Sequence, residues 1–305
     1  MIATIASHQV LALRRQRVFV ALLGTLLAMT AIAGVLGWSS HRTIVGIYDE
    51  ATKLVVSQGQ PAPANPIGLQ PTLSLLSNMV IYIPLIGALL AVVLGHLSIA
   101  DDESSGVGRL VFSRRITRST YLAGKVVAAA AVLGVILVAS LVVSTVSLWI
   151  VNGAAPTIAE LGRLGLFYGL SWMYLMVFAL IGMLAVLATR RRPLALLSAM
   201  GAWLVITFVV PQFTSGLRPT ASLNPILDPV STSQTFFKVT SKARPLSVVE
   251  QYKAASGRIL ETGPTESIGH TIARTTPIAG LLITLVVAAA LLIRHHDFSK
   301  GSSHD

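Results

Sequence analysis

Few side chains in this sequence have the types and spacing that a chemical reaction needs. Gly124 and Lys125 stand together as they do in phosphate-binding loops, but Val126 follows them and opens a long apolar run. The pattern G-x-x-x-x-G-K-[ST] does not occur, and an ATPase site is therefore not expected in this chain. The sequence has no cysteine, which excludes disulfides, thiolate metal sites and Cys nucleophiles.

Two further patterns resemble chemical sites and are interpreted differently. His295 and His296 follow Arg294 at the edge of an apolar run, where an interface anchor is a better interpretation than a metal pair. The stretch Gly169–Trp172 resembles the turn that carries a hydrolase serine, but its second glycine is missing and no histidine lies at the same membrane depth. The sequence thus predicts no catalytic residue, no metal site and no cofactor-binding site in this chain.

The composition is that of a membrane protein. Hydrophobic residues make up 53% of the 305 positions, charged residues only 11%, and the mean hydropathy is +0.74. Soluble domains carry about 25% charged residues. The net charge of +11 is assigned to membrane orientation and to anionic lipid head groups, and nucleic acid is not an expected partner.

Six uncharged runs are long enough to cross a bilayer, which requires about 20 apolar residues. We expect an all-α, polytopic membrane protein with these six helices as its spans: Val18–Trp38, Leu73–Ala100, Val126–Val151, Leu164–Thr189, Pro193–Pro211 and Pro277–Ile293. Pro84 predicts a kink in the second span. Gly162, Gly165 and Gly169 indicate close helix packing at the fourth, with lipid-facing glycines as the alternative.

Residues 1–17 are predicted to form an interfacial elbow helix that lies along the membrane surface. Ile2, Ile5, Ala6, Val10 and Leu13 would share one face, although Gln9 and Leu11 interrupt the pattern. A frayed N-terminus is the alternative. The elbow would meet the membrane interface through Arg14, Arg15 and Arg17.

The distribution of Lys and Arg predicts the orientation. Basic residues concentrate in residues 1–17, 101–125, 190–192 and 294–300, whereas the short loops on the other side hold only Arg42, Lys53 and Arg163. By the positive-inside rule both termini are cytoplasmic, and we expect a multi-pass protein of the cell (inner) membrane.

The remaining segments set the domain organisation. The stretch Ser39–Thr72 lies outside the membrane and contains prolines that forbid regular structure around Pro61–Pro66. The 213–276 segment is too long for a plain connection, and Ser247–Thr262 within it predicts a polar helix. The expected parts are the elbow 1–17, spans one to five in 18–212, the extracytoplasmic segment 213–276, and the last span with a short tail in 277–305.

Charged side chains gather in residues 101–125, between the second and third spans. An acidic cluster, Asp101–Glu103, is followed by the apolar Leu110–Phe112 and then by a dense basic turn. A charged rim around a small apolar centre is typical of a docking surface for a partner protein. The alternatives are a solvated loop edge for the acidic residues and simple membrane anchors for the arginines.

The same stretch resembles the ABC-2 family of ABC-transporter permeases. Gly106 stands seven residues before Ser113, Ser113–Arg118 corresponds to the family's Ser-x-Pro-x-Ser-Arg turn, and Tyr121–Lys125 to its Gly-Lys re-entry. The chain departs from the pattern at Val107 and Gly108, where the family has Thr and Leu, and at Arg115, which replaces the turn proline. Six spans with an elbow helix extend the resemblance over nearly the whole chain.

The resemblance implies a membrane-spanning permease subunit of an ABC exporter. A separate cytoplasmic ABC ATPase would bind ATP and Mg²⁺, and a second copy of the permease (a homodimer) or a related permease would complete the pathway, in contact with membrane lipids. The ATPase would dock on Asp102, Glu103, Gly106, Leu110, Phe112, Ser113, Arg114, Arg115 and Arg118.

Two other functions remain open. One is an ATPase-coupled membrane scaffold or mechanotransmitter that acts on an external partner through Phe213–Thr276 without transport. The other is a secondary transporter, which usually needs a titrating or ion-binding group at membrane depth. The nearest such residue is His96, at a span end. A partner ATPase would separate the first two functions from the third.

Overall fold

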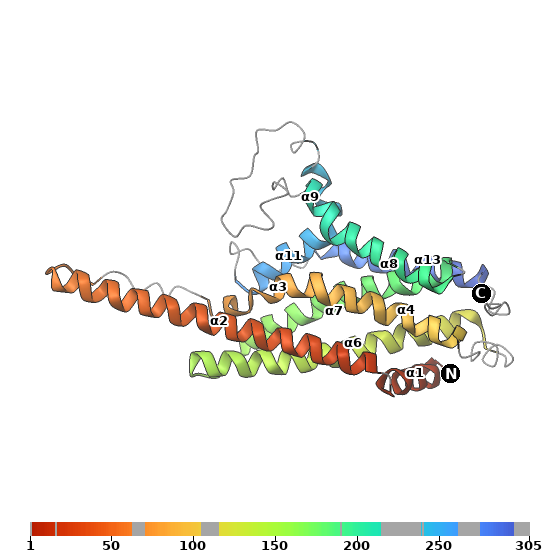
Figure 1. The fold of residues 1–305 in the computed structure, drawn as a ribbon, viewed down its shortest axis with the longest axis horizontal. Helices are drawn as coiled ribbons and strands as arrows, with labels where there is room; N and C mark the ends of the chain where they lie inside the picture. The colour runs from red at the N-terminus through yellow and green to blue at the C-terminus, as the bar shows by residue number, and fades with distance from the viewer. Residues whose placement is uncertain are drawn as a thin grey trace.

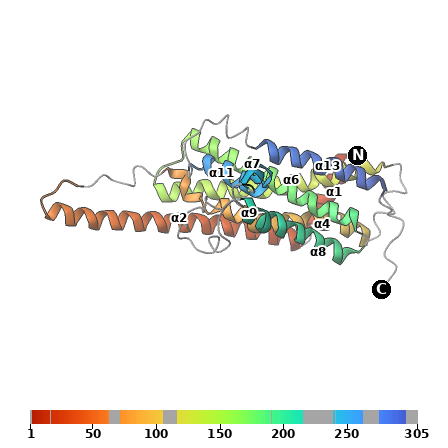
Figure 2. The same ribbon diagram turned by 90° about the horizontal axis from the view of Figure 1, so that it is seen from above.

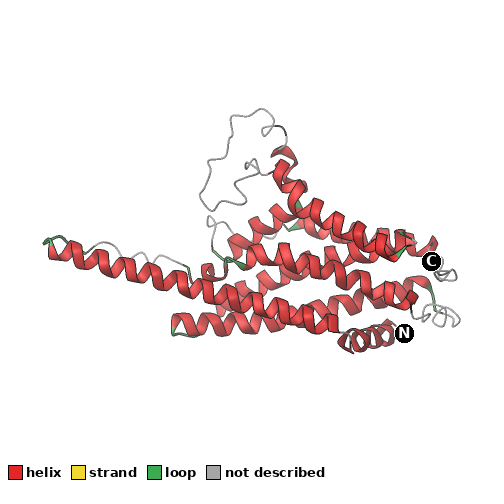
Figure 3. Cartoon of the chain, viewed as in Figure 1, coloured by secondary structure: helices red, strands yellow, loops and turns green. Residues whose placement is uncertain are grey.

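The structure is a computed structural model that describes residues 2–15, 17–62, 71–104, 116–189, 191–214, 239, 241–261 and 275–295. Within these ranges the chain is helical and contains no strand (Figure 3). Six helices are long and apolar enough to span a membrane, namely Val20–Ser57, Met79–Asp102, Arg118–Asn152, Ile158–Ala188, Arg192–Thr214 and Thr276–Arg294. The predicted all-α polytopic fold with six spans is therefore confirmed.

The helices run roughly along one axis, and this axis defines two ends (Figure 1). The α1 end holds α1 (Ile2–Arg15), the end of α4 (Ala88–Ser104), the start of α6 (Arg118–Asn152) and the end of α13 (Thr276–His295). The α11 end holds α11 (Val248–Ile259), the 3₁₀ turn η2 (Thr72–Leu76) and the short helices α3 (Met79–Tyr82) and α9 (Val210–Thr214).

The central helix is α7 (Ile158–Ala188), which packs against α4, α6, α13 and α8 (Arg192–Leu204). It begins with a capping box in which Thr157 accepts from the Glu160 amide while Glu160 accepts from the Thr157 amide. That arrangement satisfies backbone donors that an open helix start would leave without partners. Most of the apolar window of α7 is buried, so this helix carries the core of the bundle.

Close packing between α4 and α7 depends on two glycines. A Cβ atom at Gly95 would lie 1.8 Å from the Ala179 carbonyl oxygen, and one at Gly182 would lie 2.2 Å from the Val92 carbonyl oxygen. Small residues let two helix backbones approach in this way. The predicted close packing at Gly162, Gly165 and Gly169 is wrong, because among the described atoms nothing lies within 4 Å of a Cβ built at any of them.

The first span is longer than predicted. Helix α2 (Arg17–Ser57) does not end near Trp38 but continues to Ser57, and it projects beyond the other helices at the α11 end (Figures 1 and 2). Its 41 residues correspond to about 60 Å at 1.5 Å per residue, roughly twice the hydrocarbon thickness of a bilayer. At Gly37 an added Cβ would lie 2.4 Å from the Leu75 carbonyl oxygen, which marks the level at which α2 leaves the bundle.

Two spans contain π-helical turns. Pro84 lies in η3 (Ile83–Gly87), so the irregularity predicted at this proline takes the form of a π-helical turn. A second π-helical turn, η4 (Val205–Val209), was not predicted and stands between α8 and α9. Pro211 follows it and lacks the N–H that an α-helical hydrogen bond to the preceding turn would need, which gives a physical reason for the wider turn.

Candidate functional site

A buried lysine joins three helices at the α1 end. The Lys125 side chain in α6 is 2% exposed. Its ammonium lies 2.6 Å from Asp102 Oδ2 at the end of α4 and donates a 2.5 Å hydrogen bond to Gln9 Oε1 in α1. Asp101 adds a longer-range attraction. A charge removed from water in this way needs close partners, and the two that lie within hydrogen-bond distance, Asp102 and Gln9, come from different helices.

Asp102 accepts from a second residue of α6. Tyr121 donates its hydroxyl proton to Asp102 Oδ2 at 2.8 Å, and the Lys125 ammonium lies 5.3 Å from the centroid of the Tyr121 ring. Tyr121 and Lys125 are four residues apart, so they share one face of α6. The carboxylate thus fixes the end of α4 against the first two turns of α6. We refer to Lys125, Asp102, Tyr121 and Gln9 as the Lys125 cluster.

The packing of α1 explains why Gln9 interrupts the apolar pattern of the predicted elbow helix. Gln9 is 4% exposed and turns toward α6, where it accepts from Lys125, and Ala6 beside it is also buried. A Cβ at Gly124 would lie 2.8 Å from the Ile5 Cβ, so α1 approaches α6 closely at that point. The predicted helix is present, but one side of it packs on the protein, while Ile2 and Leu11 remain exposed.

Arg118 makes a contact of a different kind at the same end. Its guanidinium donates to the carbonyl of Arg294 in the last turn of α13. A cation at this position satisfies a carbonyl that has no partner within the helix and favours the negative end of the helix dipole. The Arg118 side chain is exposed. Thr117, the residue before α6, caps this helix because its hydroxyl accepts from the Thr120 amide.

The sequence of the chain matches a known family. The family model described as "ABC-2 family transporter protein" matches residues 3–297, from α1 to beyond the end of α13. The chain belongs to the ABC-2 transporter family. It is accordingly a membrane permease component of an ABC transporter. No curated protein matches the sequence.

The residues predicted for ATPase docking and for the membrane interface of the elbow helix are found in different parts of this ABC-2 permease. Asp102 belongs to the Lys125 cluster, Arg118 holds the end of α13, and Glu103 lies in the last turn of α4. Arg14 and Arg15 lie in α1, and Arg17 begins α2. The other predicted contacts lie outside the described residues: Gly106, Leu110, Phe112, Ser113, Arg114 and Arg115.

The sequence interpretation missed three members of the Lys125 cluster as functional residues. Lys125 was recognised only as part of a glycine–lysine pair, and Tyr121 only as part of the same re-entry motif. A single lysine at the start of a long apolar run, with a carboxylate at the end of the preceding run, was the available signal. Gln9 could have been found as the one polar residue on an otherwise apolar helical face.

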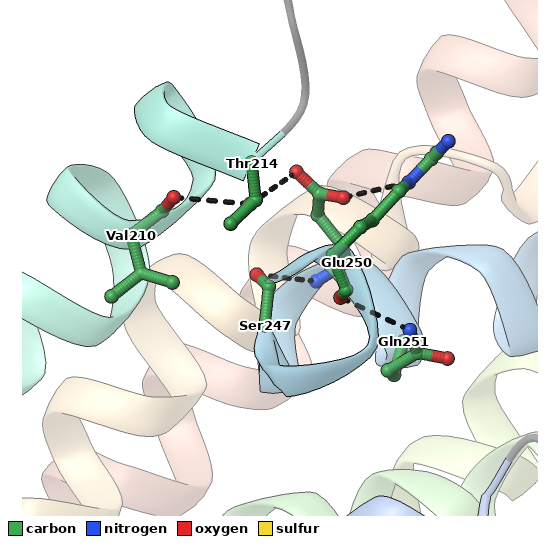
Figure 4. Close-up of polar contacts among 6 residues, drawn as sticks. Val210, Thr214, Ser247, Glu250 and Gln251 are labelled. Carbon is green, nitrogen blue, oxygen red and sulfur yellow. Dashed lines mark hydrogen bonds and ion pairs between the residues drawn. The ribbon is translucent and has the colours of Figure 1, made fainter. Parts of the chain in front are cut away.

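A second polar cluster joins α11 to the end of the fifth span (Figure 4). The buried Glu250 carboxylate accepts from the Thr214 hydroxyl at 2.9 Å and from Arg244 Nε at 2.8 Å. Ser247 caps α11 by accepting from the Glu250 amide. The polar helix predicted in Ser247–Thr262 is thus present, and its first turn is fastened to α9.

Tyr252 anchors α11 to the centre of the permease. Its hydroxyl lies 2.8 Å from Ser171 Oγ of α7, and its ring lies 4.5 Å from the Tyr174 ring. Complete burial raises the pKa of Tyr252 well above its usual value, so it stays neutral. The Ser171 hydroxyl, which belongs to the stretch Gly169–Trp172, therefore has a structural role in this hydrogen bond.

The described ranges contain no group of three or more His, Asp or Glu side chains placed to hold a metal ion.

Proposed function

We propose that this ABC-2 permease is the membrane subunit of an ATP-driven exporter that is energised by a separate ATPase docking at the α1 end. The observation that supports this most directly is the Lys125 cluster. It ties together the end of α4 and the start of α6, the two helix ends that belong to the predicted docking element 101–118. A force that the ATPase applies to these two helix ends would therefore act on helices that are already held together.

The orientation proposed with this function places the α1 end in the cytoplasm. The segments rich in Lys and Arg adjoin the start of α2, the start of α6, the end of α7, the start of α8 and the end of α13, and these helix ends lie at the α1 end. The positive-inside rule then puts both termini in the cytoplasm. It puts the arm of α2, residues 38–57, on the outer side of the cell membrane.

The sequence indicates which subunit of the transporter would bind ATP and which would form the passage. The chain has no phosphate-binding motif, so the ATPase subunit would bind ATP and Mg²⁺. The permease would supply the passage, together with a second copy of itself or a related permease and with the surrounding lipids. Closure of the ATPase pair would move the docking elements between α4 and α6 and so alter the passage between the permeases.

A second candidate function is supported by the arm of α2. Ile47 and Leu54 of this arm are more than 60% exposed beyond the level at which α2 leaves the bundle. An ATPase-coupled scaffold or mechanotransmitter would use such an arm, together with α11, to act on an external partner. Cargo flux in vesicles that contain the permease and its ATPase separates the two, because only an exporter changes the cargo concentration.

The docking proposal is tested by charge reversal. The double variant Arg114→Glu, Arg118→Glu is expected to lose most of the ATPase that co-purifies with the tagged permease in mild detergent at physiological salt. The matched control is Arg191→Glu, Arg192→Glu, which makes the same charge change at the same end of the bundle but away from 105–118. Full co-purification with the first variant, or equal loss with both, would refute docking at this turn.

A further inference from the structure

The two polar contacts at the α1 end differ in how readily they can open. The Lys125 cluster is buried, since Lys125 and Gln9 are 2% and 4% exposed and the Asp102 side chain is 17% exposed. Breaking it would leave a charge or a polar group without a partner in a site that is largely shielded from water. The Arg118 contact lies on the surface, where water and other acceptors can replace the Arg294 carbonyl at little cost.

The helix packing around the Lys125 cluster also differs from that around the Arg118 contact. Helix α1 lies on α6 with Ile5 against Gly124, so side-chain packing and the buried ion pair support each other. At the other contact the Arg118 side chain is exposed, and the carbonyl that it binds belongs to the last residues of α13, a span of which only 17% of the apolar window is buried. Helix packing therefore holds α1 on α6 more firmly than it holds α13 on α6.

We infer that α1, the end of α4 and the start of α6 form one rigid unit, the α1–α4–α6 unit, which moves relative to α13 when the Arg118 contact opens. Lys125 is the positioning residue of this unit, because its ammonium holds Asp102 of α4 and Gln9 of α1 at the same time. The inference rests on the proposed function for the source of the motion, an ATPase that acts on the segment between α4 and α6.

Arg118 would act as the releasable part of this arrangement. Its guanidinium already faces solvent while it binds the carbonyl, so a carboxylate on the docking ATPase could draw it away. The end of α13 would then lose this hydrogen bond to the start of α6, and only helix packing, mostly against α6 and α7, would still hold the sixth span. The Lys125 cluster, whose Lys125 and Gln9 side chains are buried, would stay closed throughout.

The cooperative unit is tested on the full chain alone, reconstituted in lipid nanodiscs, by hydrogen exchange. Lys125→Met is expected to raise amide exchange in α1, the last turn of α4 and the first turns of α6 together, by at least about tenfold. Arg118→Gln is expected to raise exchange only in the last turn of α13. His8→Ala, an exposed position beside Gln9, and Arg191→Gln serve as controls.

If Lys125→Met prevents folding, Lys125→Gln serves instead, because it keeps a hydrogen-bond donor at the same site. A rise confined to one of the three segments in the folded variant would overturn the inference of a single unit. An increase in α1 and α4 exchange with Arg118→Gln would also overturn it, because the surface contact would then belong to the same unit.

The motion is tested with spin labels, which the absence of cysteine makes site-selective. One labelled pair, Ser7→Cys with Ser119→Cys, lies within the unit, and the other, Ser119→Cys with Leu292→Cys, spans the Arg118 contact. Labelled chains are diluted with unlabelled chains so that distances within one copy dominate. On ATP binding by the co-reconstituted ATPase, the second distance is expected to change while the first stays constant.

A change in the first distance, or none in the second, would overturn the inference. If no ATPase binds the permease, the proposed function fails by itself. The hydrogen-exchange result still decides in that case whether α1, α4 and α6 form one unit at this end.

Discussion

Replacing Lys125 by methionine removes the only described cation that faces Asp102 inside the Lys125 cluster. The side chain keeps nearly the same length, so the change is mainly one of charge. Truncating one partner of a buried ion pair typically costs 3–5 kcal/mol, since the other charge stays buried. Asp102 is 17% exposed and retains the Tyr121 hydroxyl, which reduces the penalty. We therefore expect Lys125→Met to lower the free energy of unfolding by about 3 kcal/mol.

The matched comparison is the double variant Lys125→Met, Asp102→Leu, which removes both charges. Because no unpaired charge remains in it, the double variant is expected to be more stable than Lys125→Met alone, by about 1–2 kcal/mol. Unfolding in mixed micelles of increasing denaturing detergent, followed through the fluorescence of the four tryptophans, measures these differences. Additive losses in the double variant would show that Lys125 and Asp102 are not an interacting pair, and the argument for the unit would fail.

Two further predictions concern the packing of α7. Gly95→Ala places a methyl group against the Ala179 carbonyl and is expected to cost about 1–3 kcal/mol or more in the same assay, while Gly165→Ala, with open space around it, is expected to be neutral or slightly stabilising. A similar loss at both sites would contradict the assigned helix contact. Tyr252→Phe deletes the hydrogen bond to Ser171 but keeps the ring stack, so we expect a loss of about 1 kcal/mol and slightly faster proteolysis of α11. No change in either quantity would show that this bond does not hold α11.

The six spans could be predicted from the sequence because long uncharged runs have few other stable structures. The length of α2 could not be predicted in this way. The residues after Trp38 are mixed in polarity, and a helix continues through such residues when nothing breaks it. The first proline after Trp38 is Pro61, just beyond the end of the helix at Ser57.

The Lys125 cluster shows the limit of the sequence interpretation. Gln9 and Lys125 are 116 residues apart, and only the packing of α1 on α6 brings them together. Asp102 follows the second apolar run and Lys125 precedes the third, so the two helices could be predicted. The sequence does not show which helix ends lie together. The prediction of close helix packing at glycines was wrong for the same reason. Gly95 and Gly182 face each other's helices, whereas the more closely spaced Gly162, Gly165 and Gly169 face open space.

Site-specific photocrosslinking tests the central claim, that an ATPase docks at the α1 end, most directly. A benzoylphenylalanine replaces Ser119 at the α1 end in one variant and Gln58, beyond the end of the α2 arm, in another, and both exposed sites are irradiated in intact cells. The account predicts a crosslink from residue 119 to a Walker-type ATPase and none from residue 58. An ATPase crosslink from residue 58, or no ATPase at residue 119 while the permease is fully expressed, would contradict it.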